Sequence, residues 1–594
     1  MRAILEILLK IGRQLALCLP ILLASTAVDL AAEANTGNGA NQTDALNGKI
    51  IRMIEIEIRD IFERPTNFIY RSANTLKIST RAKVVVRELL FKEGDAYDDF
   101  AIRESERNLR TLRYLRDIKI SATPAGEYVD LLVSVRDTWT LIPQLSFSSG
   151  TGQTRRSGGI SESDLFGYGN RLEVLYGEDD QRESIQAVYD SRRVLGTHNE
   201  LLLGFFDRDD GERTLAALGK PFRSLLQDNA WGSSVDVSDT IGRLFKNGDE
   251  TYIFRQEETD LSFRYSFARG NPEALTRRYS LGYHYLERTF TQADAKDYDV
   301  LELDPAVVSN DAALLAKDRK FSGPTLRLQK VVPDFISMDY IDRFERVADY
   351  NLGHDDSLSF FFAPEALGSI DDALIVSSNH SEGIRFNRGS FLRGEVGISA
   401  RFAHDIFEDT VARTEVNYYN VFGPLYIRDL YLGKHTFASS FYIDYGHDLD
   451  ADRQLLLGGN NSLRGYKART FPGDKRFALN LEERIHLVEN AFDLISFGAV
   501  AFLDVGGATY DNMGDLIADH TYSNIGVGLR FAFPRSSGNR ILRFDVAFPL
   551  REGPEGSAEF EPRFIFSGGQ LFKSHLRSER VGAERASVDI GFDN

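Results

Sequence analysis

The feature of this chain most suggestive of a defined chemical role is a glycine-rich loop built around one arginine. Residues 458–466 read Gly-Gly-Asn-Asn-Ser-Leu-Arg-Gly-Tyr, and the segments on either side are polar. An arginine presents a rigid fork of donors that matches a carboxylate at two points. Arg464, with Leu463, Gly465 and Tyr466 beside it, is therefore either a charge on a solvated surface loop or the partner of acids elsewhere in the chain.

Two segments downstream carry acids at the spacing of β-strands. In residues 477–484 (FALNLEER) and 497–506 (FGAVAFLDVG), neighbouring residues point to opposite faces of a strand. If one face meets lipid, the other faces a lumen, where a loop arginine would form charge-assisted hydrogen bonds strengthened by partial exclusion of water. The residues expected on the lumen face beside the loop are Glu482, Phe502, Asp504 and Gly506.

The segment that must position these residues, about 141–572, alternates apolar or aromatic residues with small, polar or charged ones. Residues 261–267, 279–285, 525–533 and 542–548 show the alternation most clearly. A soluble sandwich and a transmembrane barrel both give this pattern, but about 430 residues is large for one sandwich. We expect an antiparallel transmembrane β-barrel of about 16 strands, at about 27 residues per strand with its loop.

The ends of this segment carry further signals. The strand at 562–572 is expected to close the barrel, and its aromatic residues are Phe564, Phe566 and Phe572. A polar tail, 573–594, follows, and both ends of an even-stranded barrel lie in the periplasm. The acidic run at 289–322 is expected to be a solvated extracellular loop, because it lacks the spacing of a calcium-binding loop.

A small α+β unit is expected before the barrel, over residues 49–138. Residues 50–58 and 129–136 alternate as strands, and the pattern at 81–91 predicts a helix. Asp98 or Asp99 is placed to cap a second helix. The resulting order, β-α-α-β-β, describes one domain with an edge strand available for pairing.

The first residues have the pattern of a secretory signal, predicted over 1–34. A basic start is followed by an uncharged apolar stretch, Leu15 to Ala24, which is too short for a membrane anchor, and then by small-residue cleavage sites. Residues 35–48 are predicted to be a flexible linker. Removal of the signal would also remove Cys18, the single cysteine of the chain.

Composition excludes several classes of protein. The 70 basic and 88 acidic residues give a net charge of -18, which argues against a nucleic-acid partner. A mean hydropathy of -0.27 with scattered charges excludes a bundle of membrane helices. The sequence lacks GxSxG, HExxH, Walker A and CxxC motifs, and its 10 histidines show no metal-ligand spacing. We therefore expect no enzymatic activity, no cofactor and no metal.

Several motifs together resemble the BamA/TamA-like bacterial surface antigen family of outer-membrane assembly and secretion barrels. Residues 463–466 (LRGY) resemble the family's loop motif, and 502–506 (FLDVG) and 480–484 (NLEER) are similar to two of its strand motifs. Residues 91–95 (FKEGD) are similar to a turn of its POTRA domains, and 164–170 (DLFGYGN) to an early-barrel motif. The resemblance extends over nearly the whole chain after the predicted signal.

The resemblance implies that the loop folds into the lumen, where Arg464 contacts the two strands. It also implies a factor in the bacterial outer membrane that assembles or inserts outer-membrane proteins, or translocates polypeptides. The POTRA-like domain would bind clients in the periplasm by β-augmentation. The implied partners are outer-membrane lipids, unfolded outer-membrane or secreted polypeptides, and periplasmic or accessory proteins.

The chain also departs from this family. It has one POTRA-like unit, whereas dedicated assembly factors carry several and two-partner secretion transporters usually carry two. About 22 residues follow Phe572, where such barrels usually end. Two alternatives therefore stay open: a secretion porin for one dedicated exoprotein, and a structural or surface barrel without translocase activity.

Overall fold

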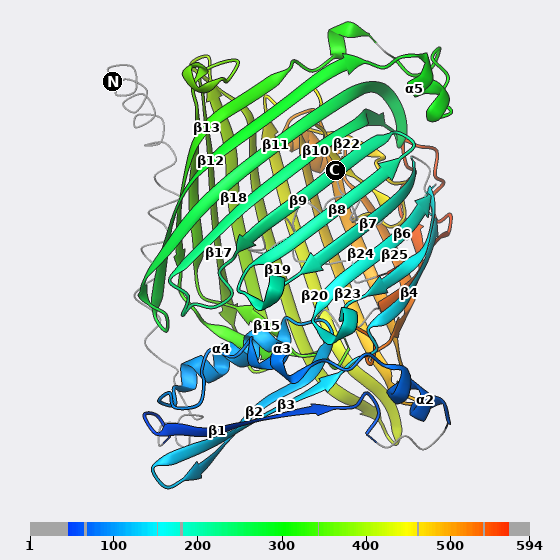
Figure 1. Ribbon diagram of the computed structural model, residues 1–594. Helices are drawn as coiled ribbons and strands as arrows, with labels where there is room; N and C mark the ends of the chain where they lie inside the picture. The colour runs from blue at the N-terminus through cyan, green and yellow to red at the C-terminus, as the bar shows by residue number, and fades with distance from the viewer. Residues whose placement is uncertain are drawn as a thin grey trace.

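A computed structural model describes residues 46–63, 68–150, 153–178, 182–309, 311–341, 344–459, 462–537 and 541–568. It shows a small N-terminal α/β domain lying against one end of a large closed barrel (Figure 1). We call this the domain end of the barrel. The predicted signal, most of the predicted linker, Phe572 and the predicted tail lie outside the described residues.

The N-terminal domain contains a three-stranded sheet of order β1-β3-β2, with β1 parallel and β2 antiparallel to β3. Val85, Leu109, Leu115, Val133 and Val135 form the centre of its core. The elements are β1 (Ile50–Arg59), α2 (Phe68–Leu76), α3 (Ala82–Val86), α4 (Asp99–Arg110), β2 (Leu115–Ala125) and β3 (Tyr128–Asp137).

Two details of this domain correct the predicted order β-α-α-β-β. Helix α2 is additional; Tyr70 and Ala73 pack against Ile61 and Phe62, whereas its ends, Phe68 and Leu76, are exposed. Helix α3 ends at Val86 instead of continuing to residue 91, because consecutive valines have low helix propensity. Helix α4 begins as predicted, with the Asp98 side chain accepting a hydrogen bond from the Phe100 amide at 3.0 Å.

The predicted class, a mainly β antiparallel barrel behind a small α+β domain, is confirmed, but its strand count is not. The described part of the barrel has twenty strands rather than about 16. Several turns contain only two residues, as between β8 and β9, so the spacing per strand is shorter than we assumed. The strands are β4 (Leu141–Gly150), β5 (Gln153–Glu162), β6 (Asn170–Glu178), β7 (Glu183–Ser191), β8 (Glu200–Arg208), β9 (Gly211–Lys220), β10 (Asn229–Lys246), β11 (Asp249–Asn271), β12 (Leu275–Gln292), β13 (Arg319–Val331), β16 (Asp355–Ala363), β17 (Ala373–Arg385), β18 (Ser390–Ala403), β19 (Ile406–Ile427), β20 (Leu430–His447), β23 (Lys475–Ala491), β24 (Ile495–Thr509), β25 (Tyr522–Ala532), β26 (Ile541–Pro549) and β27 (Arg563–Gly568).

The two faces of the barrel wall differ as the alternation predicts. On β11 and β12, Phe263 and Leu281 are exposed on the outside, whereas Asp260 and Ser280 are buried on the inside. His284, on the same inner face, lies 3.0 Å from Asp260 through its Nε2 atom. The barrel therefore has an apolar exterior and a polar lumen, as a barrel in lipid requires.

The connections between barrel strands carry smaller elements. The acidic run at 289–322 begins in β12 and ends in β13, and Asp297 within it is buried and pairs with Arg255 at 2.7 Å, so this part is not a solvated loop. No helix among the described residues is long and apolar enough to cross a membrane. The smaller elements are α5 (Ala295–Val300), β14 (Phe335–Met338), β15 (Ala348–Asn351), β21 (Leu455–Leu457), β22 (Phe471–Gly473), α6 (Met513–Ala518), η1 (Leu165–Gly167), η2 (Val194–Gly196), η3 (Ala312–Leu314) and η4 (Glu365–Leu367).

Candidate functional site

The arginine loop connects β20 to β23 and enters the barrel from the end opposite the N-terminal domain. Strands β21 and β22 pair at its base. Leu463, Arg464 and Tyr466 are each 0% exposed. A loop that buries a guanidinium this completely must supply it with partners, because an unpaired buried charge is very costly.

Arg464 is held by two carboxylates on neighbouring strands. Its Nη2 and Nε atoms lie 2.7 and 2.9 Å from the two oxygens of Asp504, which gives a bidentate pair. Its Nη1 atom lies 2.7 Å from Glu482 Oε1. The guanidinium carbon is also 3.5 Å from the centre of the Phe502 ring. The structure thus brings together four of the residues singled out in the sequence.

Asp504 is positioned by amides on both sides. Asn480, Asp504 and Asn524 lie opposite one another on β23, β24 and β25. Both asparagines donate to Asp504, at 2.8 and 2.7 Å. The carboxylate therefore accepts hydrogen bonds from three side chains, which orient it toward the arginine.

The remaining loop residues fix the backbone around Arg464. The Gly465 amide donates to Asn524 Oδ1 at 3.0 Å, and a Cβ at Gly465 would lie 2.6 Å from the Asn524 Cβ, so only glycine fits. The Tyr466 hydroxyl lies 3.0 Å from the carbonyl oxygens of Ser523 and Arg551. These contacts attach the loop to β25 as well as to the acids.

The other predicted site residues lie elsewhere. Gly506 faces the lumen but packs beside the base of the loop, where a Cβ would be 3.1 Å from the Leu457 side chain. Phe564 is 54% exposed on the outer face of β27, opposite Val546, and Phe566 lies opposite Phe544. Phe572 lies outside the described residues.

The charged cluster is larger than the sequence reasoning indicated. Asp545 Oδ2 lies 3.6 Å from Arg464 Nη1, and Arg484 Nε donates to Glu482 Oε2 at 2.8 Å. Alternation places these residues on the lumen face, but only the stagger between strands brings them beside the loop. Arg484 belongs to the 480–484 motif noted in the sequence, whereas Arg530, Arg543 and Asp545 were not predicted.

A second segment fills the lumen from the domain end. Residues 332–354 leave the wall after β13, form the hairpin β14–β15 and rejoin the wall at β16. Ile336, Ile341 and Leu352 pack against residues of the inner wall, Phe391 and Tyr419 among them. We call residues 332–354 the inner hairpin.

The inner hairpin and the arginine loop meet at the same strand. Arg484 on β23 donates to the Ile341 carbonyl at 2.8 Å and to Glu482 at 2.8 Å. Glu482 also accepts from Arg464. Two neighbouring lumen positions of β23 thus link a segment entering from one end of the barrel to a loop entering from the other.

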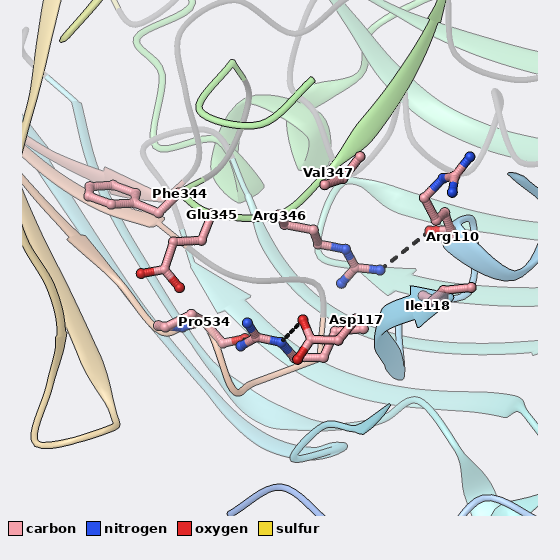
Figure 2. A pocket seen from close by; sticks show the side chains of 9 residues that line it. Arg110, Asp117, Ile118, Phe344, Glu345, Arg346, Val347 and Pro534 are labelled. Carbon is pink, nitrogen blue, oxygen red and sulfur yellow. Dashed lines mark hydrogen bonds and ion pairs between the residues drawn. The ribbon is translucent and has the colours of Figure 1, made fainter. Parts of the chain in front are cut away.

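The inner hairpin is also bonded to the N-terminal domain. Arg110 of α4 forms a bidentate pair with Asp349, at 2.7 and 3.0 Å, and Arg346 donates to the Leu112 carbonyl at 2.9 Å. A small cavity of about 120 Å³ remains between the domain, residues 344–347 and Pro534, and Figure 2 shows the side chains that line it. The domain therefore rests on the inner hairpin rather than on the barrel rim alone.

Further contacts distribute the domain around the rim. The Trp139 amide donates to the Arg535 carbonyl, and the Ser537 amide donates to the Trp139 carbonyl, each at 2.7 Å. Glu104 accepts from the Leu225 amide at 3.1 Å. These partners belong to the β25–β26 and β9–β10 turns, so the domain spans much of the barrel end.

The pKa values of two buried acids at this interface shift in opposite directions. Burial alone would raise the pKa of Glu88, but Arg192, Arg193 and Arg223 together lower it to about 2. Burial raises the pKa of Asp164 to about 7, against the effect of its hydrogen bond from Thr80 at 2.8 Å. Thr80 belongs to the N-terminal domain and Asp164 to the β5–β6 turn, so docking itself buries this carboxyl.

Comparison with known proteins places part of this chain in a described family. Residues 386–572 match the Omp85 superfamily domain. Over 509 residues the chain is 23% identical to the outer membrane protein assembly factor BamA of Nitratidesulfovibrio vulgaris, a match that covers 83% of this chain and 50% of that protein. The chain thus spans about half the length of this curated relative.

Similar solved structures include CdiB and BamA from two other bacteria. CdiB from Acinetobacter baumannii is 12% identical, with a TM-score of 0.44, over 88% of this chain and 74% of that chain. BamA from Haemophilus ducreyi lacking POTRA domains 1–3 is 14% identical, with a TM-score of 0.35, over 87% of this chain and 84% of that chain.

Replacing Arg464 by alanine leaves Asp504 and Glu482 buried without their cation. Removal of one partner of a buried ion pair costs about 3–5 kcal/mol. We expect the free energy of unfolding, measured by urea titration in detergent micelles, to fall by about that amount, and lysine to restore only part of it because it lacks the planar fork.

Arg103→Ala is the matched control, because Arg103 pairs with Asp99 at the exposed surface of α4. An exposed pair contributes about 0–1 kcal/mol. Equal losses in the two variants would show that the lumen pair does not stabilise the barrel.

The raised pKa of Asp164 predicts that docking of the N-terminal domain depends on pH. The docked state holds the proton more tightly than the separated state, whose carboxyl has a pKa of about 3.9. Docking is therefore strongest in acid, weakens as the pH rises toward about 7, and changes little above that. Energy transfer between dyes on the domain and on the barrel, measured from pH 5 to 8, would report the docked fraction.

Asp164→Asn should remove this dependence, since an amide does not titrate. The ionisation of Glu88 does not interfere, because its pKa of about 2 keeps it charged throughout this range. A docked fraction that rises with pH, or that depends on pH equally in the asparagine variant, would contradict the assignment.

Proposed function

The chain belongs to the Omp85 superfamily of bacterial outer-membrane barrels, and from this premise we propose that it assembles or inserts outer-membrane proteins or translocates polypeptides. The predicted membership is confirmed at the level of this superfamily, as is the outer-membrane location. The superfamily consists of transporters and assembly factors rather than enzymes. Which polypeptides this chain handles, and how, is part of the proposal.

The weakness of the barrel seam carries the proposal. The wall closes between β27 and β4. Strand β4 contains Pro143, which cannot donate a ladder hydrogen bond, and its second half reads Ser-Phe-Ser-Ser-Gly. A serine-rich strand with a proline pairs weakly and in a poorly specified register. A client strand could therefore replace β27 beside β4 at low cost.

The N-terminal domain would supply the first binding step by β-augmentation. Strand β1 is partly occupied at its edge, because Ile51 exchanges backbone hydrogen bonds with Asp95 and Gly94, at 2.9 and 2.8 Å. Strand β2 is the other edge, and among the described residues β3 is its only strand partner. We therefore assign client pairing to β2.

The arginine loop would serve as a structural lock rather than as a catalytic group. Arg464 ties the loop to β23 and β24, and Gly465 and Tyr466 tie it to β25, close to the seam. A rigid wall beside a weak seam confines opening to one place. The N-terminal domain and the tail at 573–594 would lie in the periplasm, since both ends of a barrel with an even number of strands lie on one side.

Cross-linking tests the role of the seam. Cysteines scanned along 141–143 and paired with cysteines along 563–566 should abolish assembly or translocation when oxidised, and a reductant should restore it. The control pair, at Val235 and Leu261, lies directly opposite across β10 and β11 in the same wall. Full activity with a closed seam, or equal inhibition by the control pair, would contradict the proposal.

Deletion of the gene separates the alternatives. Loss of several barrels from the outer membrane favours assembly, and loss of one secreted protein favours a dedicated secretion porin. For the third candidate, a structural barrel, neither the outer-membrane nor the secreted proteome changes.

A further inference from the structure

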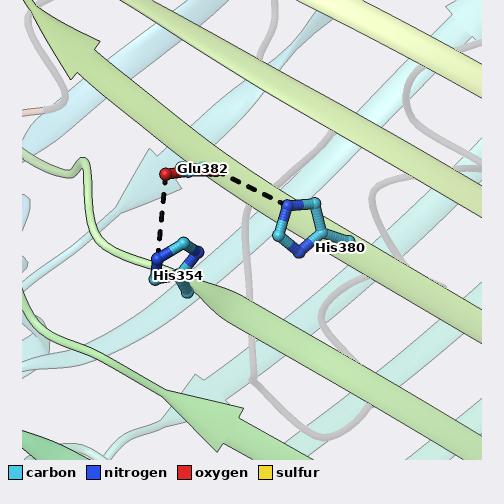
Figure 3. Close-up of side chains that lie close together, drawn as sticks. All are labelled: His354, His380 and Glu382. Carbon is cyan, nitrogen blue, oxygen red and sulfur yellow. Dashed lines mark ion pairs between the residues drawn. The ribbon is translucent and has the colours of Figure 1, made fainter. Parts of the chain in front are cut away.

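Two histidines and a glutamate converge outside the lumen, near the domain end of the barrel. Figure 3 shows His354, in the connection before β16, together with His380 and Glu382 of β17. The Nε2 atoms of His354 and His380 lie 3.7 and 3.8 Å from the two carboxylate oxygens of Glu382. All three ligand atoms lie within 4.8 Å of one another.

The cluster is on the outer face of the wall and is accessible. His380 lies opposite Val396 of β18, and Ile384 follows on the same face of β17; these apolar residues are 45% and 56% exposed. The side chains of His354, His380 and Glu382 are 28%, 37% and 39% exposed. An ion can therefore reach the site without passing through the lumen.

The spacing is that of groups around an ion rather than of groups bonded to one another. Hydrogen bonds between nitrogen and oxygen span about 2.7–3.2 Å, shorter than either separation here. With bonds of about 2.0–2.1 Å, two ligands of a tetrahedral metal lie roughly 3.3 Å apart. Side-chain rotations that move these atoms by up to about 1.5 Å would bring the three groups to that distance.

A fourth residue orients His380. Its Nδ1 atom contacts Oδ1 of Asp356, which lies directly opposite it on β16. A proton held on Nδ1 by a carboxylate leaves Nε2 with its lone pair directed at Glu382 and His354, an arrangement typical of metal-bound histidines. Lys330 lies 3.7 Å from the other oxygen of Asp356 and balances its charge.

We propose that His354, His380 and Glu382 bind a divalent transition-metal ion of the zinc class, with Asp356 as the residue that positions His380. Two imidazoles and one carboxylate are a ligand set that zinc-class ions prefer, whereas magnesium and calcium prefer oxygen ligands alone. Water would complete the coordination at this exposed site. The proposal does not depend on the function proposed above.

The metal would fix the point where the inner hairpin rejoins the wall. His354 is the last residue of that segment, and its carbonyl accepts from the Val332 amide at 2.8 Å. The Gly383 amide of β17 donates to the Leu352 carbonyl at 2.9 Å. An ion joining His354 to β17 would reinforce this junction, through which the N-terminal domain contacts the barrel.

Calorimetric titration of ZnCl2 into the full chain, purified in detergent without a histidine tag, tests the site. We expect one zinc ion per chain. His354→Asn combined with His380→Asn should weaken binding more than about 100-fold, and Asp356→Asn about 10–100-fold, the range for residues that orient ligands. Zinc should also raise the thermal midpoint of the unaltered chain but not of the double variant.

His404→Asn is the matched control, because His404 lies near two carboxylates, 3.4 Å from Asp371 and 3.2 Å from Glu408, but near no second histidine in the described clusters. It should leave zinc affinity unchanged. Absence of saturable zinc binding, unchanged binding in the folded double variant, or equal binding of MgCl2 would overturn the proposal.

Discussion

The position of the arginine loop depends on one buried charge cluster, in which Arg464 pairs with Asp504 and Glu482. Arg464 lies on a loop, and Asp504 and Glu482 lie on adjacent strands. None of the three side chains has water-exposed surface. A guanidinium is stable there only because its geometry matches the two carboxylates and because Asn480 and Asn524 also donate hydrogen bonds to Asp504. The positions of the loop, of β23 to β25 and of the charged residues around them all follow from that requirement.

The same requirement connects the two ends of the molecule. Glu482 accepts from Arg464 on one side and from Arg484 on the other, and Arg484 continues to the inner hairpin. The inner hairpin in turn pairs with Arg110 of the N-terminal domain through Asp349. A path of ion pairs and hydrogen bonds, with the inner hairpin between them, therefore joins the domain to the loop.

Much of this arrangement follows from alternation along single strands, and the rest requires the register between strands. Period 2 places Glu482 and Asp504 on the lumen face without any structural information. It cannot show that Asn480 and Asn524 stand opposite Asp504, or that Asp545 reaches Arg464, because stagger is a property of pairs of strands. His354 and His380 escaped notice for the same reason: they are far apart in the sequence and meet only where β16 pairs with β17. The inner hairpin was missed because its two strands have 4 residues each, too few to show a period.

The lumen cluster also has a consequence for the order of events during folding. Every acid that holds Arg464 lies after it in the chain, and the wall closes only when β27 reaches β4, across more than 400 residues of sequence. Contacts of such long range form slowly, because the entropy of closing the loop is lost before the contacts form. A chain that has delivered its first fifteen barrel strands still has an open edge and an unpaired arginine. Arg464 can be buried only once β23 and β24 are also available, so its burial belongs to the later part of the protein's own biogenesis.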